Sequence, residues 1–268
     1  MNQQPIGVFD SGLGGLTVVK ELMKILPHEN IVYFGDTGRV PYGTRGKETI
    51  IEYAKQDIQF LQHHQVKMII AACGTVSAVL PKEYSSHLQQ PYTGVVIPSA
   101  QAACAKTKTG HIGVLGTSAT IRSGAYGKAI RTILPKAVVT GIACPLFVPL
   151  VENGYINRDN QVTRMVAEDY LKPIIGTDLD TLILGCTHFP IIKEIIGDIL
   201  GKDVKLIDSG YETARTAAAM LSRENMLLNS EQLGNRSFYV SDSIETFTEN
   251  ATIFLNEEIT GSVEHHVW

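Results

Sequence analysis

Two cysteines, one in each half of the chain, end short apolar runs and are followed by small or hydroxylated residues. Cys73 follows residues 66–72, and Cys186 follows residues 181–185. Nearly uncharged, β-branched runs of this kind are typical of buried parallel strands, and the residues after each cysteine indicate a helix start. Thr75 is a candidate cap of the first of these helices. Both thiols are therefore predicted at the carboxyl ends of strands, where open parallel sheets bind ligands and a helix N-terminus favours the thiolate.

Two thiols that face a small ligand from opposite sides could invert a stereocentre. One thiolate would remove a proton from carbon, while the opposite thiol delivers a proton to the other face. Each thiol needs a neighbour that takes or holds its proton. For Cys73 the candidate is Asp10, and for Cys186 the candidates are His188 and Glu152. Hydroxyls and backbone N–H groups would bind an anionic substrate at Ser11, Thr75 and Thr187.

Other readings of the cysteines fit the pattern less well. Taken singly, each could be an ordinary buried core residue, and we interpret Cys104 and Cys144 as core or loop residues. A metal site would have only three candidate ligands, and the cysteines lack close ligand spacing. Hydrolysis by one thiol with His188 leaves the second thiol without a role. Disulfide redox chemistry requires the two thiols to touch, and the sequence has no CxxC pair.

The segments that must position these residues repeat a strand–turn–helix pattern. Residues 6–10 indicate a strand that ends in Asp10, and the glycine-rich turn 11–15 leads into a helix. The turn matches neither a Walker loop nor a dinucleotide fingerprint, but its backbone N–H groups could bind an anion. A carboxylate at this position is poorly placed for core packing. The loop 39–43 is predicted at the same edge of the sheet.

The second half of the chain repeats this order, which suggests a duplicated α/β unit. Gly7 precedes Cys73 at nearly the same spacing as Gly113 precedes Cys186. We expect nine strands alternating with helices and a largely parallel architecture, with a late edge strand at 237–240 and a surface tail containing His265 and His266. The expected strands are 6–10, 31–34, 66–72, 94–98, 111–117, 137–142, 181–185, 204–207 and 237–240. Because no Pro/Gly/Ser-rich linker separates the halves, the chain is expected to cross between them more than once.

Composition limits the classes of function. The 268 residues are 44% hydrophobic and 19% charged, with a net charge of −4, which describes a folded globular chain without a nucleic-acid surface. Residues 1–5 are polar, so we expect no signal peptide, and no apolar stretch reaches the roughly 20 residues that span a bilayer. Four cysteines without dense spacing favour a reducing cytoplasm.

Several short motifs together resemble the bacterial glutamate racemases, cofactor-independent members of the aspartate/glutamate racemase superfamily. The matching stretches are residues 7–17, 35–37, 41–43, 72–75, 94–98, 149–152 and 184–190. This resemblance implies an isomerase that interconverts L- and D-glutamate. By the same resemblance, Cys73 acts on D-glutamate and Cys186 on L-glutamate, with Asp10, His188 and Glu152 assisting.

The resemblance also implies which residues contact substrate. These positions are Asp10, Ser11, Pro41, Tyr42, Gly43, Gly74, Thr75, Thr117, Thr187 and His188. Many members of the family have Asn directly after the first cysteine, whereas this chain has Gly74. The side-chain amide of that Asn is therefore missing here, which bears on substrate affinity and on the choice between glutamate and a related substrate.

The resemblance further implies a fold and a role in the cell. The fold class is α/β, with two similar, mainly parallel-sheet domains and the active site between them. The first domain is expected to comprise residues 1–97 plus 208–268, and the second residues 98–207. Family members need no cofactor or metal, are commonly homodimers, and supply D-glutamate for peptidoglycan, hence for cell-wall biogenesis and cell shape. Same-fold rivals are aspartate and hydantoin racemases, and the non-enzyme rival is a two-domain small-acid binding protein with structural cysteines.

Overall fold

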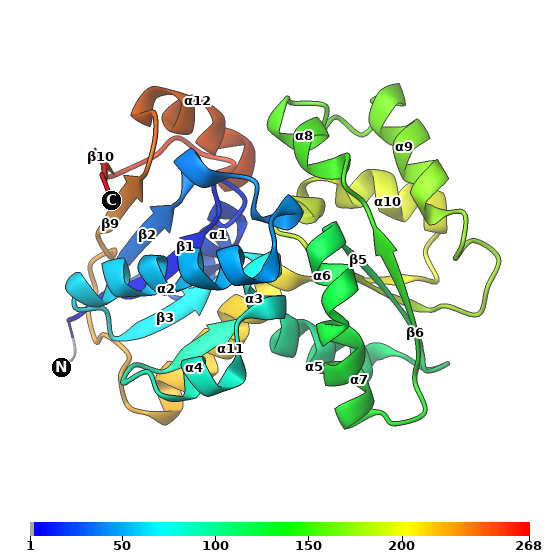
Figure 1. Ribbon diagram of the computed structural model, residues 1–268, viewed down its shortest axis with the longest axis horizontal. Helices are drawn as coiled ribbons and strands as arrows, with labels where there is room; N and C mark the ends of the chain where they lie inside the picture. Colours follow the sequence, from blue (N-terminus) through cyan, green and yellow to red (C-terminus); the bar gives the residue numbers. More distant parts are fainter. Residues whose placement is uncertain (1–2) are drawn as a thin grey trace.

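The computed structural model describes residues 3–268 and contains two separate parallel β-sheets, each packed among helices (Figure 1). All strand pairs in this part of the chain are parallel, as the α/β fold class predicts. Met1 and Asn2, which begin the segment where no signal peptide is expected, lie outside the described residues. Among the described residues, no helix has the length and apolarity needed to cross a membrane.

The first sheet has six strands in the order β10-β9-β2-β1-β3-β4. Its strands are β1 (Ile6–Asp10), β2 (Ile31–Gly35), β3 (Met68–Ala71), β4 (Tyr92–Gly94), β9 (Arg236–Val240) and β10 (Ser262–His265). Alternate side chains of a strand point to opposite faces. In β1, Ile6 and Val8 therefore join one apolar core, whereas Phe9 joins another.

Helices cover both faces of this sheet. The helical segments are α1 (Leu16–Ile25), η1 (Thr37–Arg39), η2 (Tyr42–Thr44), α2 (Lys47–His63), α3 (Gly74–Val79), α4 (Lys82–Ser86), α11 (Ser209–Arg223) and α12 (Ile244–Leu255). The core that contains Val8 also includes residues of α1, α11 and α12, such as Leu16 and Phe247. The core that contains Phe9 includes residues of α2, such as Ile58. Both faces of the central strands are thus shielded from water, which explains why β1, β2 and β3 are almost continuously apolar.

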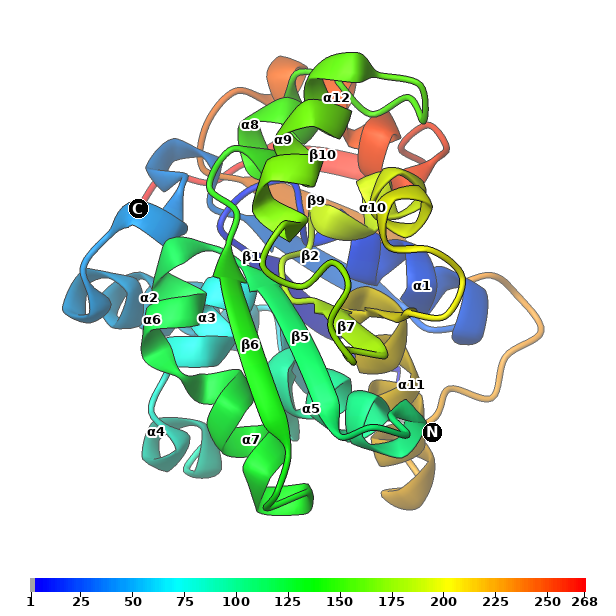
Figure 2. The ribbon, with the colours of Figure 1, turned by 90° about the vertical axis from the view of Figure 1, so that its right-hand side faces the viewer.

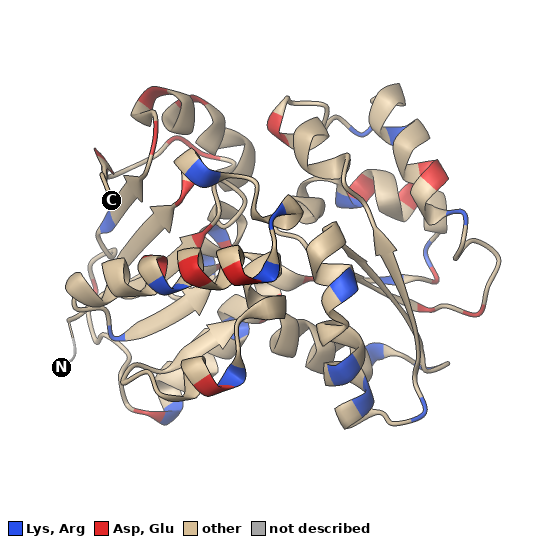
Figure 3. Cartoon of the chain, viewed as in Figure 1, with Lys and Arg blue, Asp and Glu red and all other residues tan. Residues whose placement is uncertain are grey.

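The second sheet has four strands in the order β6-β5-β7-β8. Its strands are β5 (His111–Gly116), β6 (Val138–Ala143), β7 (Thr181–Leu184) and β8 (Lys205–Asp208). The helical segments around it are α5 (Val96–Lys106), α6 (Ser118–Ser123), α7 (Ala125–Ile133), α8 (Phe147–Glu152), α9 (Gln161–Leu171), η3 (Phe189–Ile192) and α10 (Lys193–Leu200). Figure 2 shows β5 and β6 side by side, with β6 at the exposed edge. Acidic and basic residues are interspersed over both halves of the molecule (Figure 3).

The chain crosses between the sheets twice. It leaves the first sheet after β4 and reaches β5 through α5, and it returns after β8 through α11. These two connecting helices pack against each other. We propose residues 1–97 plus 208–268 and residues 98–207 as the two domains, a division supported by the separate sheets.

Residues 94–98 differ from the predicted strand. Strand β4 ends at Gly94, and α5 begins at Val96. Pro98 lies in the first turn of α5, where a missing backbone N–H costs no helical hydrogen bond. The short apolar run is therefore a strand end followed directly by a helix start, which the local pattern does not distinguish from a continuous strand.

The end of the sequence also differs from the prediction. Residues Ser262–His265 form a tenth strand, β10, which pairs with β9. Strand β9 is therefore internal rather than an edge strand, and the expected surface tail is wrong. The His266 ring lies 4.7 Å from the Phe60 ring, centroid to centroid, so this segment packs on the domain. An edge strand needs few inward apolar residues, which explains why its polar sequence resembles a tail.

Candidate active site

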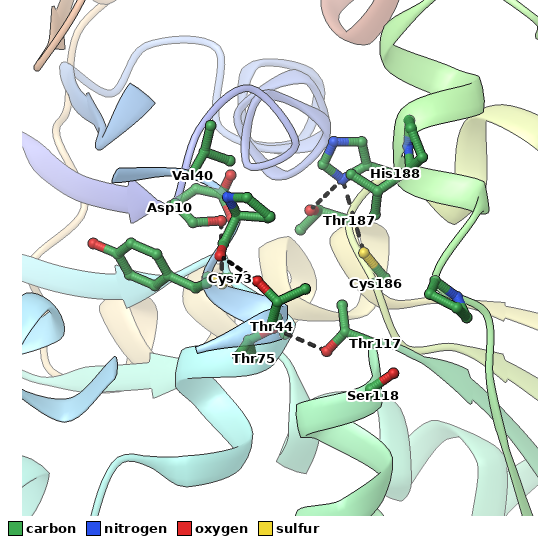
Figure 4. A pocket seen from close by; sticks show the side chains of 18 of the residues that line it. Asp10, Val40, Thr44, Cys73, Thr75, Thr117, Ser118, Cys186, Thr187 and His188 are labelled. Carbon is green, nitrogen blue, oxygen red and sulfur yellow. Dashed lines mark hydrogen bonds between the residues drawn. The ribbon is translucent and has the colours of Figure 1, made fainter. Parts of the chain in front are cut away.

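A pocket of about 360 Å³ lies between the two halves of the molecule and is lined from both (Figure 4). Every site residue predicted from the sequence lines it. These residues are Asp10, Ser11, Pro41, Tyr42, Gly43, Cys73, Gly74, Thr75, Thr117, Glu152, Cys186, Thr187 and His188. The pocket therefore assembles residues from positions 10 to 188 of the sequence in one small space.

Strand register explains how these residues converge. In the first sheet, Phe9 of β1 is level with Ala71 of β3, so Asp10 and Cys73 leave the same edge of adjacent strands. In the second sheet, Cys186 follows β7 at the equivalent edge. Because the carboxyl ends of parallel strands form the usual ligand-binding edge, the two edges together form the walls of the pocket.

Cys73 is almost completely buried, at 4% exposure. Its thiol donates a hydrogen bond to the Ser11 hydroxyl, with 3.7 Å between Sγ and Oγ. Burial, and secondly the neighbouring Asp10 carboxylate, raise the pKa of Cys73 to about 12. The backbone N–H of Val76 at the start of α3 lowers this pKa, as a helix start is expected to do, but burial outweighs it. The following helix, α3, has only six residues, and Cys73 itself rather than Thr75 is its N-cap.

Asp10 lies beside Cys73, as its predicted role requires (Figure 4). The side chain is 1% exposed, and its Oδ2 accepts a hydrogen bond from the Gly12 backbone N–H at 3.0 Å. Burial raises the pKa of Asp10, while the positive charge of His188 opposes that change. With this raised pKa, Asp10 can accept and release a proton near neutral pH more readily than an ordinary surface aspartate can.

The second thiol has a two-residue relay behind it. His188 Nδ1 lies 3.8 Å from Cys186 Sγ, and His188 Nε2 lies 2.9 Å from Glu152 Oε1. The sequence left open whether His188 or Glu152 serves this thiol, and the structure places His188 next to it with Glu152 behind. Burial alone would lower the pKa of His188, but the hydrogen bonds with Cys186 and Glu152 outweigh burial and raise it to about 10. His188 is therefore an imidazolium at neutral pH.

Hydroxyl groups bridge the two walls of the pocket. The Thr75 and Thr117 hydroxyls lie 3.0 Å apart, and Thr117 also caps α6 by accepting the Thr120 N–H (Figure 4). Thr187 Oγ1 lies 3.5 Å from His188 Nδ1. None of the described residues that line the pocket is Lys or Arg. An anionic ligand would therefore be bound by hydroxyls, backbone N–H groups and the protonated His188.

Gly74 occupies a position without room for a side chain. A β-carbon built at Gly74 would lie less than 3.0 Å from the Gly185 carbonyl oxygen. The turns that carry the two cysteines thus touch each other through their backbones. This contact explains why the chain can have glycine here, and it leaves the Gly74 N–H as the polar group that this residue could offer to a ligand.

The sequence prediction missed several residues that line the pocket. They are Val40, Thr44, Ser118, Cys144, Pro145, Val148 and Pro149. Cys144 was expected to be a core or loop residue, and it is both fully buried and part of the lining. One available signal was its position directly after β6, since the other two cysteines also lie just beyond the ends of strands, two residues after β3 and β7.

The described residues contain neither a disulfide nor a cluster of metal ligands. All four cysteines are free thiols. Within residues 3–268, no group of three or more His, Cys, Asp or Glu side chains could hold a metal ion. The groups that do converge are two thiols, each with its own acid or base neighbour, which is the arrangement required for proton transfer on two faces of one carbon.

Comparison with known proteins gives a consistent result. The family model described as Asp/Glu/Hydantoin racemase matches residues 14–217. The chain is 45% identical over 259 residues to a glutamate racemase of Geobacter metallireducens, covering 97% of this chain and 95% of that protein. Its structure is similar to a glutamate racemase isoform of Bacillus anthracis, with a TM-score of 0.94, 35% identity, and coverage of 99% and 98% of the two chains. It is also similar to the Francisella tularensis glutamate racemase in complex with D-glutamate, with a TM-score of 0.90, 39% identity, and coverage of 100% and 98%.

Proposed function

The chain belongs to the Asp/Glu/hydantoin racemase family and is an isomerase, and from that premise we propose that it interconverts L-glutamate and D-glutamate. The relatives at about 45% identity are glutamate racemases, and one similar structure was determined with D-glutamate. The observation that carries the proposal is that Cys73 and Cys186 reach one pocket from separate sheets.

The protonation states support a direct two-thiol mechanism. We place the reactive thiolate on Cys186, because the His188 ring lies 3.8 Å from its sulfur and could balance the negative charge, whereas burial keeps the proton on Cys73. For L-glutamate, the Cys186 thiolate removes the Cα proton and the Cys73 thiol delivers its own proton to the opposite face. One C–H bond breaks, one C–H bond forms, and the proton count of the enzyme is unchanged. For D-glutamate the two thiols exchange roles: Cys73 first gives its proton to Asp10, and Cys186 takes a proton from His188.

The neighbouring groups make these proton transfers feasible. Asp10 is positioned to take the Cys73 proton before the reverse reaction, and His188, supported by Glu152, stabilises charge on Cys186. Substrate carboxylates would be bound by the hydroxyls of the pocket and by backbone N–H groups of its loops. The residues proposed for this role are Ser11, Tyr42, Gly43, Gly74, Thr75, Thr117 and Thr187, whereas Pro41, which has no N–H group, would contact the apolar part of the substrate.

The wider role follows from the same proposal. A glutamate racemase would supply D-glutamate for peptidoglycan in the cytoplasm, without an added cofactor, and so support cell-wall synthesis and cell shape.

We also propose a homodimer. Exposed apolar side chains such as Val162 and Met165 on α9, at 48% and 68% exposure, are suited to burial between two copies. Sedimentation velocity at several protein concentrations would distinguish a dimer from a monomer.

One experiment tests the reaction and the substrate together. The protein is incubated with L-glutamate in D₂O, and NMR follows the loss of the Cα proton while polarimetry follows optical rotation. We expect both signals to decay without added cofactor, and aspartate to react with a much lower kcat/KM. Retention of the Cα proton would contradict the proposal. Equal kcat/KM values for the two amino acids would leave racemisation intact but contradict the preference for glutamate.

A further inference from the structure

Trp268, the only tryptophan in the sequence, packs against the loop that lines one side of the pocket. Figure 2 shows the end of the chain beside the blue segment that precedes α2. The Arg39 guanidinium carbon lies 4.1 Å from the centre of the Trp268 ring and 4.1 Å from that of Tyr53. The indole N–H of Trp268 points to Asp36, with 3.4 Å between Nε1 and Oδ1. Phe34 supports the indole from its edge, with ring centroids 5.3 Å apart.

Asp36 connects this contact to the pocket. It is fully buried, and its Oδ2 accepts hydrogen bonds from Arg39 Nε at 2.6 Å and from the Tyr42 hydroxyl. The Tyr42 hydroxyl also reaches Asp57 Oδ2 at 3.1 Å. Tyr42 is itself fully buried and is one of the five consecutive residues, 40–44, that line the pocket. The route from Trp268 to the pocket therefore takes two steps, through the Arg39–Asp36 pair and then through Tyr42.

The ion pair between Arg39 and Asp36 depends on the Trp268 ring that covers Arg39. Among the described residues, Arg39 is the cation that forms ion pairs with the two buried carboxyl groups, at 2.6 Å from Asp36 and 3.6 Å from Asp57. Burial, and then the charge of Asp36, raise the pKa of Asp57 well above its usual range, so the closer pair, Arg39 with Asp36, is the stronger of the two. The side chain of Arg39 is 18% exposed. The Trp268 ring covers it, and without that ring the guanidinium could turn towards water and leave Asp36 unpaired.

We propose that Trp268 is a positioning residue for substrate binding. By holding Arg39 on Asp36, it fixes the Tyr42 hydroxyl, and through it the backbone of residues 41–43 at the wall of the pocket. The chemistry of the thiols does not depend on it, because Cys73 and Cys186 lie outside this network. The choice of glutamate as the ligand rests on the proposed function, whereas the contact between Trp268 and the loop does not.

The first test separates substrate binding from catalysis. In Trp268→Ala we expect KM for glutamate to rise about threefold to tenfold, because a partly exposed cation–π contact and one hydrogen bond are lost, while kcat stays within about twofold. Trp268→Phe keeps a ring over Arg39 but loses the N–H group, so its KM should fall between those of the parent and Trp268→Ala. Val267→Ala removes a neighbouring side chain that is 75% exposed, and it should match the parent. An unchanged KM in Trp268→Ala, or an equal increase in Val267→Ala, would overturn the proposal.

The second test examines the route through Arg39. If Trp268 acts through this guanidinium, adding Trp268→Ala to Arg39→Ala should raise KM by much less than it does in the parent. Equal effects in both backgrounds would overturn the route. Amide hydrogen exchange of residues 36–45, measured without substrate, should be faster in Trp268→Ala than in Val267→Ala. This measurement does not depend on the substrate, so a parent enzyme inactive on glutamate would refute the proposed function and still leave the loop contact tested.

Discussion

Gly74 lies against the carbonyl oxygen of Gly185, so the two turns that carry the cysteines meet backbone to backbone. One glycine belongs to the first half of the chain and the other to the second. The width of the pocket between Cys73 and Cys186 therefore depends on a contact whose backbone would have to move to accept a β-carbon at Gly74. A substitution at Gly74 acts on the spacing of the two thiols and not merely on the chemistry of one side chain.

Gly74→Ala should lower kcat/KM for glutamate by about tenfold or more, because overpacking at a close backbone contact costs about 1–3 kcal/mol. Steady-state racemisation in both directions provides the measurement. Gly197→Ala is the matched control, since Gly197 also lies in a helix but a β-carbon there would make ordinary contact with Leu206. If the Gly74 variant kept parent activity, the backbone contact could not define the pocket.

Cys73→Ser and Cys186→Ser should each reduce racemisation by about 10²-fold to 10⁴-fold in both directions, the usual contribution of a general acid or base. Neither change leaves a large cavity, so circular dichroism should show a folded protein. Cys104→Ser is the matched control, because Cys104 is a free, half-buried cysteine outside the pocket. A folded Cys73→Ser protein with nearly parent activity would refute the two-thiol mechanism.

Glu152→Gln should move the basic limb of the pH–kcat/KM profile to lower pH. The carboxylate helps to hold the pKa of His188 near 10, so its removal lets His188 lose its proton at lower pH. The free energy of unfolding should also depend on this proton. The proton on His188 stabilises the fold fully below the usual histidine pKa of 6.5, and this stabilisation is lost as the pH rises towards about 10. Glu258→Gln, at an exposed position, should leave the profile unchanged. An unshifted limb in Glu152→Gln would show that the relay does not control this proton.

Lys67→Met should lower the free energy of unfolding by about 3–5 kcal/mol, because it leaves Glu29 as a buried charge without its cation. Lys67 Nζ lies 2.5 Å from Glu29 Oε2, and both residues are buried. Urea denaturation gives the measurement. Lys24→Met removes an exposed ion pair with Glu21 and should cost less than about 1 kcal/mol. Similar losses in the two variants would mean that burial does not set the strength of the Lys67 pair.

The sequence predicted correctly the features that a short local pattern determines by itself. The apolar runs before Cys73 and Cys186 are strands, and the predicted residues gather at one pocket, because parallel strands end at a common edge. The sequence did not predict the features that depend on packing between segments far apart in the chain. Strand β10 forms because β9 offers it an edge, and burial rather than the local helix start controls the pKa of Cys73.

The contact between α5 and α11 has a mechanical consequence. Both covalent connections between the halves run through these helices, and the helices pack together, so a rotation of one half against the other has its axis there. Such a rotation displaces atoms in proportion to their distance from the axis. Val40 and Glu152 line both the pocket and an adjoining cavity of about 220 Å³, so this side is loosely filled. We therefore expect substrate to enter, and either enantiomer to leave, past Glu152, through a gap that a rotation of the two halves widens.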